Sequence, residues 1–495
     1  MIGRLNRRRG LELIAASAGA LLVDPSHAFG AERAAAQRSL SALQNAVRGK
    51  VVVRGAAGYD STRRSMVWNP RVADLRVPDA IVQVTSAQDA AAAIKFARAH
   101  GLKVSVRSGG HNYQGAVLRN GGLLLDLSGL KCVSVDVGRR RANIGPGVKS
   151  GELASALAGH GLAFPVGHCS DVALGGYLLN GGWGWNAGEW GPACMSVTGV
   201  EMLTADGELV YADEKSNSEL FWAARGAGPG FFAVVTRFDL ALKPVRTGIQ
   251  TFAVSFPVAA TSIIGEWLRQ VLPSIHRTIE VACTLGPIEP KGPPLVVVSA
   301  VSFAATAAEA HARLAPLRKL PAGATPLGPD IDQPANFSEI QQQNDLANPS
   351  GKRMGGDQLY SDASPERLLQ AVQHLTTVMP SAPSAIAIGS LGGSAPAPSM
   401  PSPQEAALLS ESGVTSIGAY AFWDDPAEDA RNLNWVNSVL GASEKFRKGR
   451  YVGEADLAVT ANRVRECFSP EAWTRLVTLR EKYDPTGLLY SYLTN

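Results

Sequence analysis

The sequence lacks a strong charge of either sign, a long apolar run and any paired arrangement of cysteines. Lysine and arginine number 47 against 43 aspartate and glutamate, and the net charge of +4 over 495 residues argues against a nucleic-acid partner. Apart from the N-terminus, no segment looks like a membrane span, so we expect no stable membrane insertion. No Cys-x-x-Cys pair occurs, which argues against a disulfide framework or a metal site. The five cysteines are Cys132, Cys169, Cys194, Cys283 and Cys467.

The first 30 residues have the pattern of an export signal. Arg7-Arg8-Arg9 precedes a modest apolar stretch at residues 11–23, and Ser26-His27-Ala28 fits a small-residue cleavage site. The twin arginines resemble a twin-arginine signal, so we predict a signal peptide at residues 1–30 and a periplasmic or secreted protein. A basic, disordered start is the alternative. The length exceeds one compact core, which predicts two domains.

The first half of the chain alternates strand and helix patterns. Short apolar strands are expected at residues 51–53, 81–84 and 104–106, with a helix from Ser86 to Gly101 between the last two. The third strand leads into a glycine-rich loop, and α/β folds bind ligands at such strand ends. Further strands are predicted at 123–127, 133–137, 231–238 and 295–299, a hairpin at 202–210, helices at 32–48, 152–160, 218–225 and 307–320, and a surface linker at 394–403.

Two glycine-rich loops carry the chemistry. The first reads Arg107-Ser-Gly-Gly-His111-Asn-Tyr-Gln-Gly115, and the second runs from Gly167-His-Cys169 to Gly184. Glycines let a backbone approach a ligand closely and point N–H groups at negative oxygens. Neither loop has the G-x-G-x-x-G spacing, which disfavours an ordinary Rossmann domain. The histidine and the cysteine could hold opposite edges of one flat cofactor; alternatively, they are a loop histidine bonded to backbone and a buried thiol.

Together these motifs closely resemble the berberine-bridge-enzyme branch of the vanillyl-alcohol-oxidase superfamily of FAD-dependent oxidases. The hairpin at 197–210, the helix end at 221–226 and the closing Lys482-Tyr-Asp-Pro485 are similar as well, so the resemblance spans about residues 70–490. It implies an α+β, two-domain fold of the PCMH type. The expected parts are an FAD-binding domain at 31–244, a substrate domain at 245–450 with an antiparallel sheet backed by helices, and a C-terminal segment at 451–495 that returns to the first domain.

The resemblance also implies how FAD is held. It implies two covalent links, from His111 to the 8α carbon and from Cys169 to ring position 6 of the flavin. The remaining cofactor-binding positions that it implies are Arg107, Ser108, Gly109, Gly110, Asn112, Gly115, Gly167, Val172, Leu174, Gly175, Gly176, Gly181, Gly182, Gly184 and Val200.

The catalytic base departs from the family pattern. Relatives carry a tyrosine in an Asn-Tyr-x-Asp stretch, where this chain has Gly453-Glu454-Ala-Asp456. Glu454 becomes the first candidate, because burial beside an apolar ring would raise the pKa of a carboxyl group. A solvated loop glutamate is the alternative reading. Tyr451 and Asp456 are the next candidates for the base, and Tyr490, Tyr492 and Trp423 are candidates for contacting substrate.

FAD accepts a hydride from a carbon that bears O–H or N–H. The substrate expected first is a sugar or oligosaccharide hydroxyl, with dioxygen as acceptor and hydrogen peroxide as product. Leu174 stands where relatives control oxygen access and leaves another electron acceptor open. A secondary-metabolite alcohol or amine, including oxidative ring closure, is the rival substrate class. A binding protein that has lost its flavin is the non-enzymatic alternative.

Overall fold

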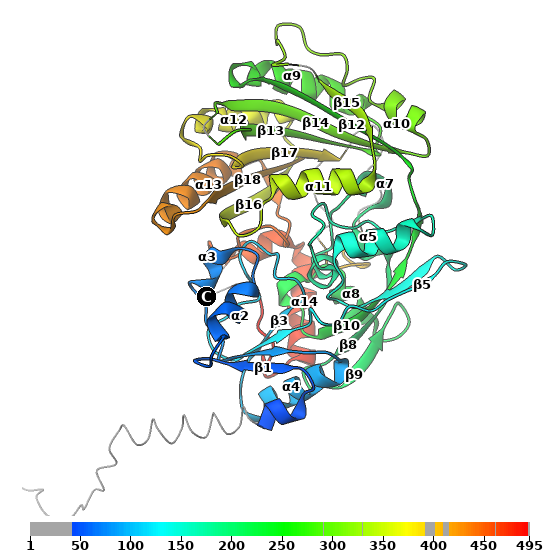
Figure 1. Cartoon of the computed structure of the whole chain (residues 1–495), viewed down its shortest axis with the longest axis vertical. Helices are drawn as coiled ribbons and strands as arrows, with labels where there is room; N and C mark the ends of the chain where they lie inside the picture. Colours follow the sequence, from blue (N-terminus) through cyan, green and yellow to red (C-terminus); the bar gives the residue numbers. More distant parts are fainter. Residues whose placement is uncertain are drawn as a thin grey trace, which may run out of the picture.

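The computed structural model describes residues 42–290, 292–328, 330–391, 401–408, 415–460 and 462–493. The predicted signal at 1–30, most of the predicted helix at 32–48 and most of the linker at 394–403 lie outside these residues, so export stays a prediction. In Figure 1 a large sheet with its helices stands above two smaller sheets, and the red C-terminal segment packs among the smaller ones. Within the described residues, none of the helices is long and apolar enough to cross a membrane.

The first small sheet positions the His111 loop. Its strand order is β1-β2-β4-β3, and both β2 and β3 run parallel to β4. The helix before β3 begins where the Ser86 side chain accepts a hydrogen bond from the Asp89 N–H at 3.1 Å. Its alanine-rich face is buried against the sheet. The elements are β1 (Lys50–Val53), α2 (Tyr59–Ser65), α3 (Pro70–Ala73), β2 (Ala80–Gln83), α4 (Ala87–Ala99), β3 (Val104–Arg107) and β4 (Leu123–Asp126).

The second small sheet is antiparallel, in the order β5-β6-β10-β8-β9. The predicted hairpin forms β8 and β9, with Gly207 at φ 74° in its turn. The predicted strand at 231–238 begins later, at Val234, because Phe231 and Phe232 are buried in the core after a tight turn. The elements are β5 (Val133–Asp136), β6 (Arg141–Ile144), α5 (Ser150–Ala158), β7 (Leu162–Ala163), α6 (Leu174–Leu179), α7 (Ala187–Trp190), β8 (Val197–Leu203), β9 (Leu209–Ala212), α8 (Ser218–Ala224), β10 (Val234–Ala241), β11 (Lys243–Pro244) and α14 (Pro470–Tyr483).

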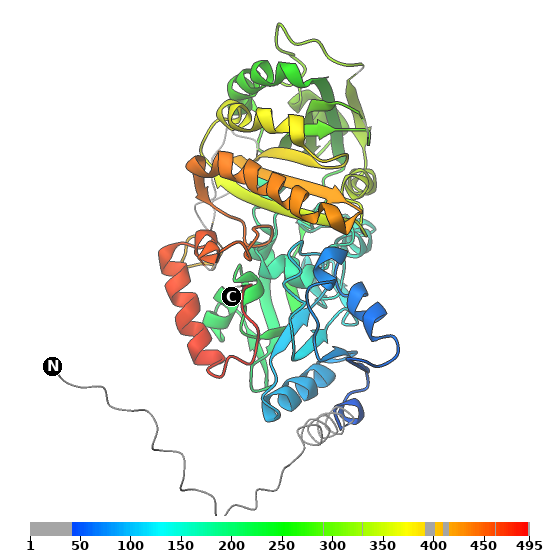
Figure 2. The ribbon, with the colours of Figure 1, turned by 90° about the vertical axis from the view of Figure 1, so that its left-hand side faces the viewer.

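The large sheet has eight antiparallel strands in the order β15-β12-β14-β13-β17-β18-β16-β19. Alternate residues of its strands face two sides. One side packs under α9, α12 and α13, whereas Ile249 and Phe303 on the other side pack against Ile340 of α11. Figure 2 shows α13 lying across its strands. The elements are β12 (Gly248–Pro257), α9 (Thr261–Val271), β13 (Ile279–Pro287), β14 (Pro294–Ala304), α10 (Ala307–Arg313), β15 (Ile331–Ala335), α11 (Phe337–Ala347), β16 (Arg353–Ser361), α12 (Pro365–Val372), β17 (Ala385–Leu391), β18 (Thr415–Trp423), α13 (Asp429–Ser443) and β19 (Arg447–Gly449).

The predicted α+β class, with an antiparallel sheet backed by helices, is therefore confirmed. One helix is shorter than predicted. The helix expected at 307–320 ends at Arg313, because Pro316 disfavours helical backbone at the residue before it.

Side chains from segments beside the first small sheet donate hydrogen bonds to the large sheet. Asn69 donates to the carbonyl oxygens of Tyr113 and Met354 at 2.8 and 2.9 Å, and Gln114 donates to the Gly356 carbonyl at 2.7 Å. The bonds to Met354 and Gly356 each join a residue before 115 to β16, whereas the bond to Tyr113 stays within the first part of the chain. The His111 loop thus lies directly beneath the large sheet.

Candidate active site

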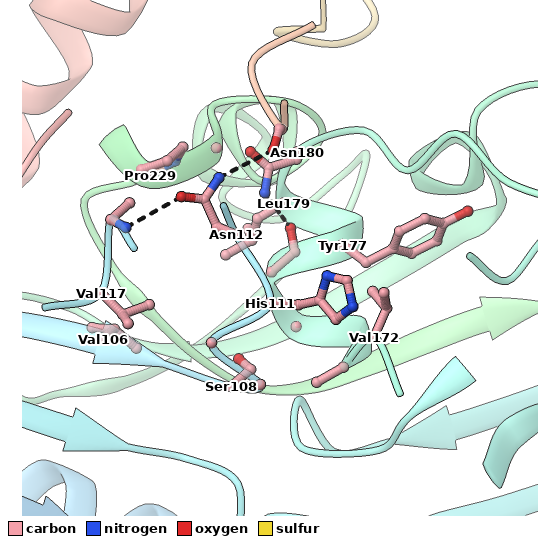
Figure 3. A pocket seen from close by; sticks show the side chains of 18 of the residues that line it. Val106, Ser108, His111, Asn112, Val117, Val172, Tyr177, Leu179, Asn180 and Pro229 are labelled. Carbon is pink, nitrogen blue, oxygen red and sulfur yellow. Dashed lines mark hydrogen bonds between the residues drawn. The ribbon is translucent and has the colours of Figure 1, made fainter. Parts of the chain in front are cut away.

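A cavity of about 380 Å³ lies where the two glycine loops meet the large sheet and the segment after β19. This volume falls within the range of roughly 300–1,000 Å³ that small-molecule sites occupy. Figure 3 shows Ser108, His111, Asn112 and Val172 pointing around it from the two loops. Of the predicted cofactor positions, those that line it are Ser108, Gly109, Gly110, His111, Asn112, Gly167, Cys169, Val172, Gly175 and Gly176.

The Arg107 side chain holds the first loop in shape. Its guanidinium donates to Met66 O at 2.7 Å and Gly109 O at 3.0 Å, and it pairs with Asp126 at 2.7 Å. Gly110 has φ 72°, in the left-handed region that favours glycine. Arg107 therefore supports the loop, and it is not among the described residues that line the cavity.

The two glycine loops pack back to back. A Cβ on Gly175 would lie 2.2 Å from Ser108 Oγ, and a Cβ on Gly109 would lie 2.6 Å from the Cβ of Ala173. Neither glycine position therefore has room for a side chain. By contrast, a Cβ on Gly176 would meet nothing within 4 Å. The loops consequently present bare backbone to one side of the cavity, as a pyrophosphate or a flat ring requires.

His111 occupies the edge of the cavity. Its ring stacks on Trp68 with 5.0 Å between centroids. Its Nε2 atom is 3.1 Å from Asp171 Oδ1, but the geometry gives it no hydrogen bond, and the atom is buried. Burial, the largest single influence, raises the pKa of Asp171, but His111, Lys149 and a backbone hydrogen bond together outweigh it, so the pKa of this carboxyl lies below its usual value. The buried Nε2 therefore has a charged neighbour in the Asp171 carboxylate but no well-directed hydrogen bond.

Cys169 lies on the cavity wall with its thiol largely buried. Asn344 Nδ2 donates a hydrogen bond to Sγ at 3.1 Å. Burial raises the pKa of Cys169 to about 12, and the carboxylates of Asp171 and Asp345 add to the rise. The thiol is therefore protonated at neutral pH unless its surroundings change.

Glu454 projects into the same cavity from the loop after β19. The hydroxyl of Tyr420, on β18, donates to Glu454 Oε2 at 2.7 Å. Burial raises the pKa of Glu454, although the Tyr420 bond and the nearby histidines oppose the rise. Asn112 donates to the Gly453 carbonyl at 3.1 Å, which ties the His111 loop to the Glu454 loop. A Cβ on Gly453 would lie 2.7 Å from the Tyr451 ring, so that ring fills the side-chain space there.

His168 also lines the cavity and is held by a carboxylate. Its Nε2 lies 2.9 Å from Glu280 Oε2 on β13, and its ring meets Trp185 edge to face at 4.5 Å. Burial, the largest single influence, lowers the pKa of His168, but the hydrogen bond and charge of Glu280 together with the charge of Glu454 outweigh it, and the pKa lies above its usual value.

Other predicted site residues have different positions. Tyr451 lines the cavity, where burial raises the pKa of its hydroxyl well above the usual value, so the phenol stays protonated near neutral pH and cannot accept a proton there. Tyr490 also lines it, with its ring 5.2 Å from the guanidinium of Arg119. Tyr492 is buried and donates to Ala227 O at 2.7 Å, and Trp423 lies in the large-sheet core and donates to Asp429 at 2.7 Å. Asp456 accepts from the Ala458 N–H at 3.0 Å.

Tyr492, Trp423 and Asp456 are absent from the cavity lining formed by the described residues, as are six of the predicted cofactor positions besides Arg107. Leu174 and Val200 are fully buried in the core of the second sheet. The others shape the backbone where a Cβ would collide with a neighbour; they are Gly115, Gly181, Gly182 and Gly184.

Sequence reasoning missed several lining residues. Tyr113 and His168 adjoin the motifs and could have been found by proximity, whereas Tyr420 and Asn344 come from the large sheet and its helix, with no local signal. In the part of the chain that the structure describes, no cluster of His, Cys, Asp or Glu side chains could hold a metal ion.

Comparison with known proteins gives consistent matches. A profile described as an FAD binding domain matches residues 78–213. The FAD-linked oxidoreductase nodO of Hypoxylon pulicicidum is 30% identical over 431 residues, which cover 86% of this chain and 92% of that protein. The (R)-6-hydroxynicotine oxidase of Paenarthrobacter nicotinovorans is 35% identical over 239 residues, or 46% of this chain and 51% of that protein.

Solved structures agree over nearly the whole chain. The 6-hydroxy-D-nicotine oxidase of Arthrobacter nicotinovorans matches with a TM-score of 0.78 at 25% identity, over 90% of this chain and 98% of that one. The xylooligosaccharide oxidase of Myceliophthora thermophila C1, in complex with xylobiose, matches with a TM-score of 0.80 at 21% identity, over 92% and 98%. At that identity the second likeness shows the fold alone.

Proposed function

The chain belongs to the FAD-linked oxidoreductases of the berberine-bridge-enzyme-like family, with the vanillyl-alcohol-oxidase type of fold that its sequence predicted, and on this premise we propose that it oxidises an alcohol carbon. When bound, FAD supplies a two-electron acceptor for a hydride. The observation that supports the proposal is the enclosed carboxyl group of Glu454, in the same cavity as His111 and Cys169.

Glu454 takes the hydroxyl proton of the substrate in this proposal. Tyr420 donates to one carboxylate oxygen, Oε2, which leaves Oε1 available to the substrate. A carboxylate whose pKa is raised by burial is a stronger base once ionised, and burial is the largest influence on Glu454. The aromatic walls, including Tyr113 and Tyr420, exclude water and offer faces on which a sugar ring or another flat substrate can stack.

The glycine loops and two side chains would hold the flavin. The bare backbone at Gly109, Gly110 and Gly176 lines the cavity and would let the pyrophosphate and the ring approach closely. Of the three positions, only a Cβ on Gly176 would enter open space. We propose covalent links at both His111 and Cys169, supported by the buried Nε2 of His111, which has no well-directed hydrogen bond, and by the position of the sulfur in the lining of the same cavity. Two tethers hold a flavin without an enclosing lid, which suits bulky substrates.

The links are tested by intact-mass analysis of the denatured protein. We expect the wild type, His111→Ala and Cys169→Ala each to carry the mass of FAD, and the double variant to carry none. Loss of all covalent flavin in either single variant would contradict two independent links. A colourless wild-type protein of unmodified mass would support the flavin-free binding protein instead.

Dioxygen is proposed as the final acceptor, giving hydrogen peroxide. Leu174, which the resemblance linked to oxygen access, is fully buried in the core and is not itself among the described residues that line the cavity, although its neighbours Ala173 and Gly175 are. It therefore offers no ground for excluding oxygen. Peroxide formation during turnover in air, measured by a coupled peroxidase assay, distinguishes this from transfer to a quinone.

An amine is the second candidate substrate. A protonated amine would pair with the Glu454 carboxylate, which lines the cavity, and the Glu280 carboxylate adds negative charge nearby through its contact with the lining residue His168. Anaerobic flavin bleaching with a panel of mono- and oligosaccharides, aliphatic and benzylic alcohols, and secondary amines discriminates between the candidates. Bleaching by the sugars or other alcohols supports the first candidate, and bleaching by amines alone would replace it with the second.

A further inference from the structure

Three consecutive residues of the Cys169 loop each bind a side chain of the large-sheet half. His168 binds Glu280 of β13 at 2.9 Å, and Ser170 donates to Asp345 of α11 from its N–H at 2.9 Å and from its hydroxyl at 2.5 Å. Between them, Cys169 Sγ accepts the bond from Asn344 of α11 at 3.1 Å. The cysteine is thus presented to the cavity by residues more than 100 positions away in the chain.

The helix that supplies Asn344 is fixed in place. A capping box closes its N-terminus, where Asn336 accepts from the Glu339 N–H at 3.0 Å and Glu339 accepts from the Asn336 N–H at 2.8 Å. Ile340, one turn before Asn344, packs under the large sheet with Trp185. The amide of Asn344 is therefore aimed at the sulfur by a rigid element and does not merely reach it by chance.

The surroundings of Cys169 make its thiolate form unfavourable. A thiolate is the form that attacks carbon, yet Cys169 is buried and lies near Asp171 and Asp345. Burial and both carboxylates disfavour the thiolate. The N–H of Asn344 favours it, and this is the one stabilising hydrogen bond that a described side chain gives the sulfur. Hydrogen bonds to an ionised acceptor are about twice as strong as neutral ones.

We propose that Asn344 is the positioning residue for flavin attachment at Cys169, holding the sulfur toward the ring and stabilising its thiolate. This inference rests on the proposed sulfur link. In the attachment step the thiol loses its proton and the sulfur bonds to ring carbon 6, which loses its hydrogen. The two electrons released reduce the flavin and pass to dioxygen, so that thiol, flavin and O₂ give thioether and H₂O₂.

The test isolates the sulfur link in a His111→Ala background. Full-length chains prepared from a flavin-depleted host are mixed with FAD in air-saturated buffer and denatured at intervals, and the flavin-bearing fraction is measured by intact mass. Asn344→Leu, which keeps the shape but removes the donor, should slow attachment about tenfold or more at pH 7. Raising the pH should restore the rate, because more of the thiol then ionises. A purely structural defect would show no such rescue.

Gln343→Leu is the matched control, since Gln343 precedes Asn344 on α11 and is exposed. It should attach flavin at the rate of the background. Quenching of FAD fluorescence ensures that variants are compared at equal occupancy, and Asn344→Ala replaces the leucine variant if that variant binds no FAD. Equal rates with and without Asn344 would overturn its role alone. Flavin on Cys169→Ala but never on His111→Ala would overturn both the sulfur link and this role.

Discussion

Glu454 is the proposed base of the site, and its buried surroundings lead to a specific kinetic prediction. Burial holds the pKa of this carboxyl above its usual value. Only the ionised form accepts a proton, so anaerobic flavin reduction should rise with pH through that elevated pKa. Glu454→Gln should slow reduction by about two orders of magnitude and flatten the pH dependence. Stopped-flow absorbance of the flavin measures both.

Tyr420→Phe serves as the control for Glu454. The Tyr420 hydroxyl lowers the pKa of Glu454 by donating to it, so its loss should move the rising limb to higher pH. The plateau rate should change less than in the glutamine variant. A glutamine variant that reduces at the normal rate would exclude Glu454 as the base.

At the residue scale the sequence predicted the parts of the site that are local. His111 and Cys169 stand inside glycine motifs, and the resemblance of these local motifs to a family carried the prediction. Tyr420 and Asn344 lie on elements that bring no such motif, and they reach the cavity only because the large sheet packs over the loops. The positions of Tyr492 and Trp423 could not be inferred from their aromatic character, because the residue type is the same whether a ring is buried in the core or lines a cavity.

At the scale of the element, two neighbouring glycines of α6 lead to opposite predictions for substitution by alanine. A Cβ added to Gly175 would lie 2.2 Å from Ser108 Oγ and 2.7 Å from the Cβ of Pro146, so there is no room for it. A Cβ added to Gly176 would meet nothing within 4 Å. Gly175→Ala should lower the free energy of unfolding by about 1–3 kcal/mol through overpacking, and weaken FAD binding as the loops separate. Gly176→Ala should fold at least as stably, since alanine favours helix by up to about 1 kcal/mol.

Urea unfolding and FAD titration of both variants check this prediction. Equal stability of the two alanine variants would mean that the loops are not packed as described.

One helix shows why sequence patterns can misplace the end of an element. The helix that ends at Arg313 was overextended because apolar spacing continued past it, although Pro316 already carried the stop signal.

At the scale of the whole molecule, Arg353 joins the two halves. Its guanidinium lies 2.8 Å from Asp74 in the small-sheet half and 2.5 Å from Asp429 at the start of α13. Arg353 is the largest cause of the lowered pKa of each carboxyl group. Arg353→Met should cost about 1–3 kcal/mol in the free energy of unfolding, less than a fully buried pair because both aspartates are partly exposed.

The pH dependence of this contribution has a definite sign. Carboxyl groups with lowered folded pKa values add stability above their unfolded pKa of about 4 and lose it as the pH falls through the folded value. The difference between wild type and Arg353→Met should therefore be full at pH 7 and shrink in acid. Urea unfolding of both proteins at several pH values measures this difference in the free energy of unfolding. A difference that stays constant down to pH 2 would show that packing, and not charge, is responsible for the effect.

The overall architecture could be predicted because the family motifs cover most of the chain. The contacts between the halves could not, since bonds such as Gln114 to Gly356 join positions with no shared pattern. These contacts depend on register and packing, which no local stretch encodes. The shared cavity is thus a property of the assembled molecule.

The ring of Tyr451 has a consequence for substitutions at position 453. It already occupies the volume that a side chain there would need. Gly453→Asn would therefore displace the phenol, which lines the cavity, and change the shape of the pocket. Position 453 thus acts on the cavity wall indirectly, through a ring two residues away, although it carries no side chain of its own.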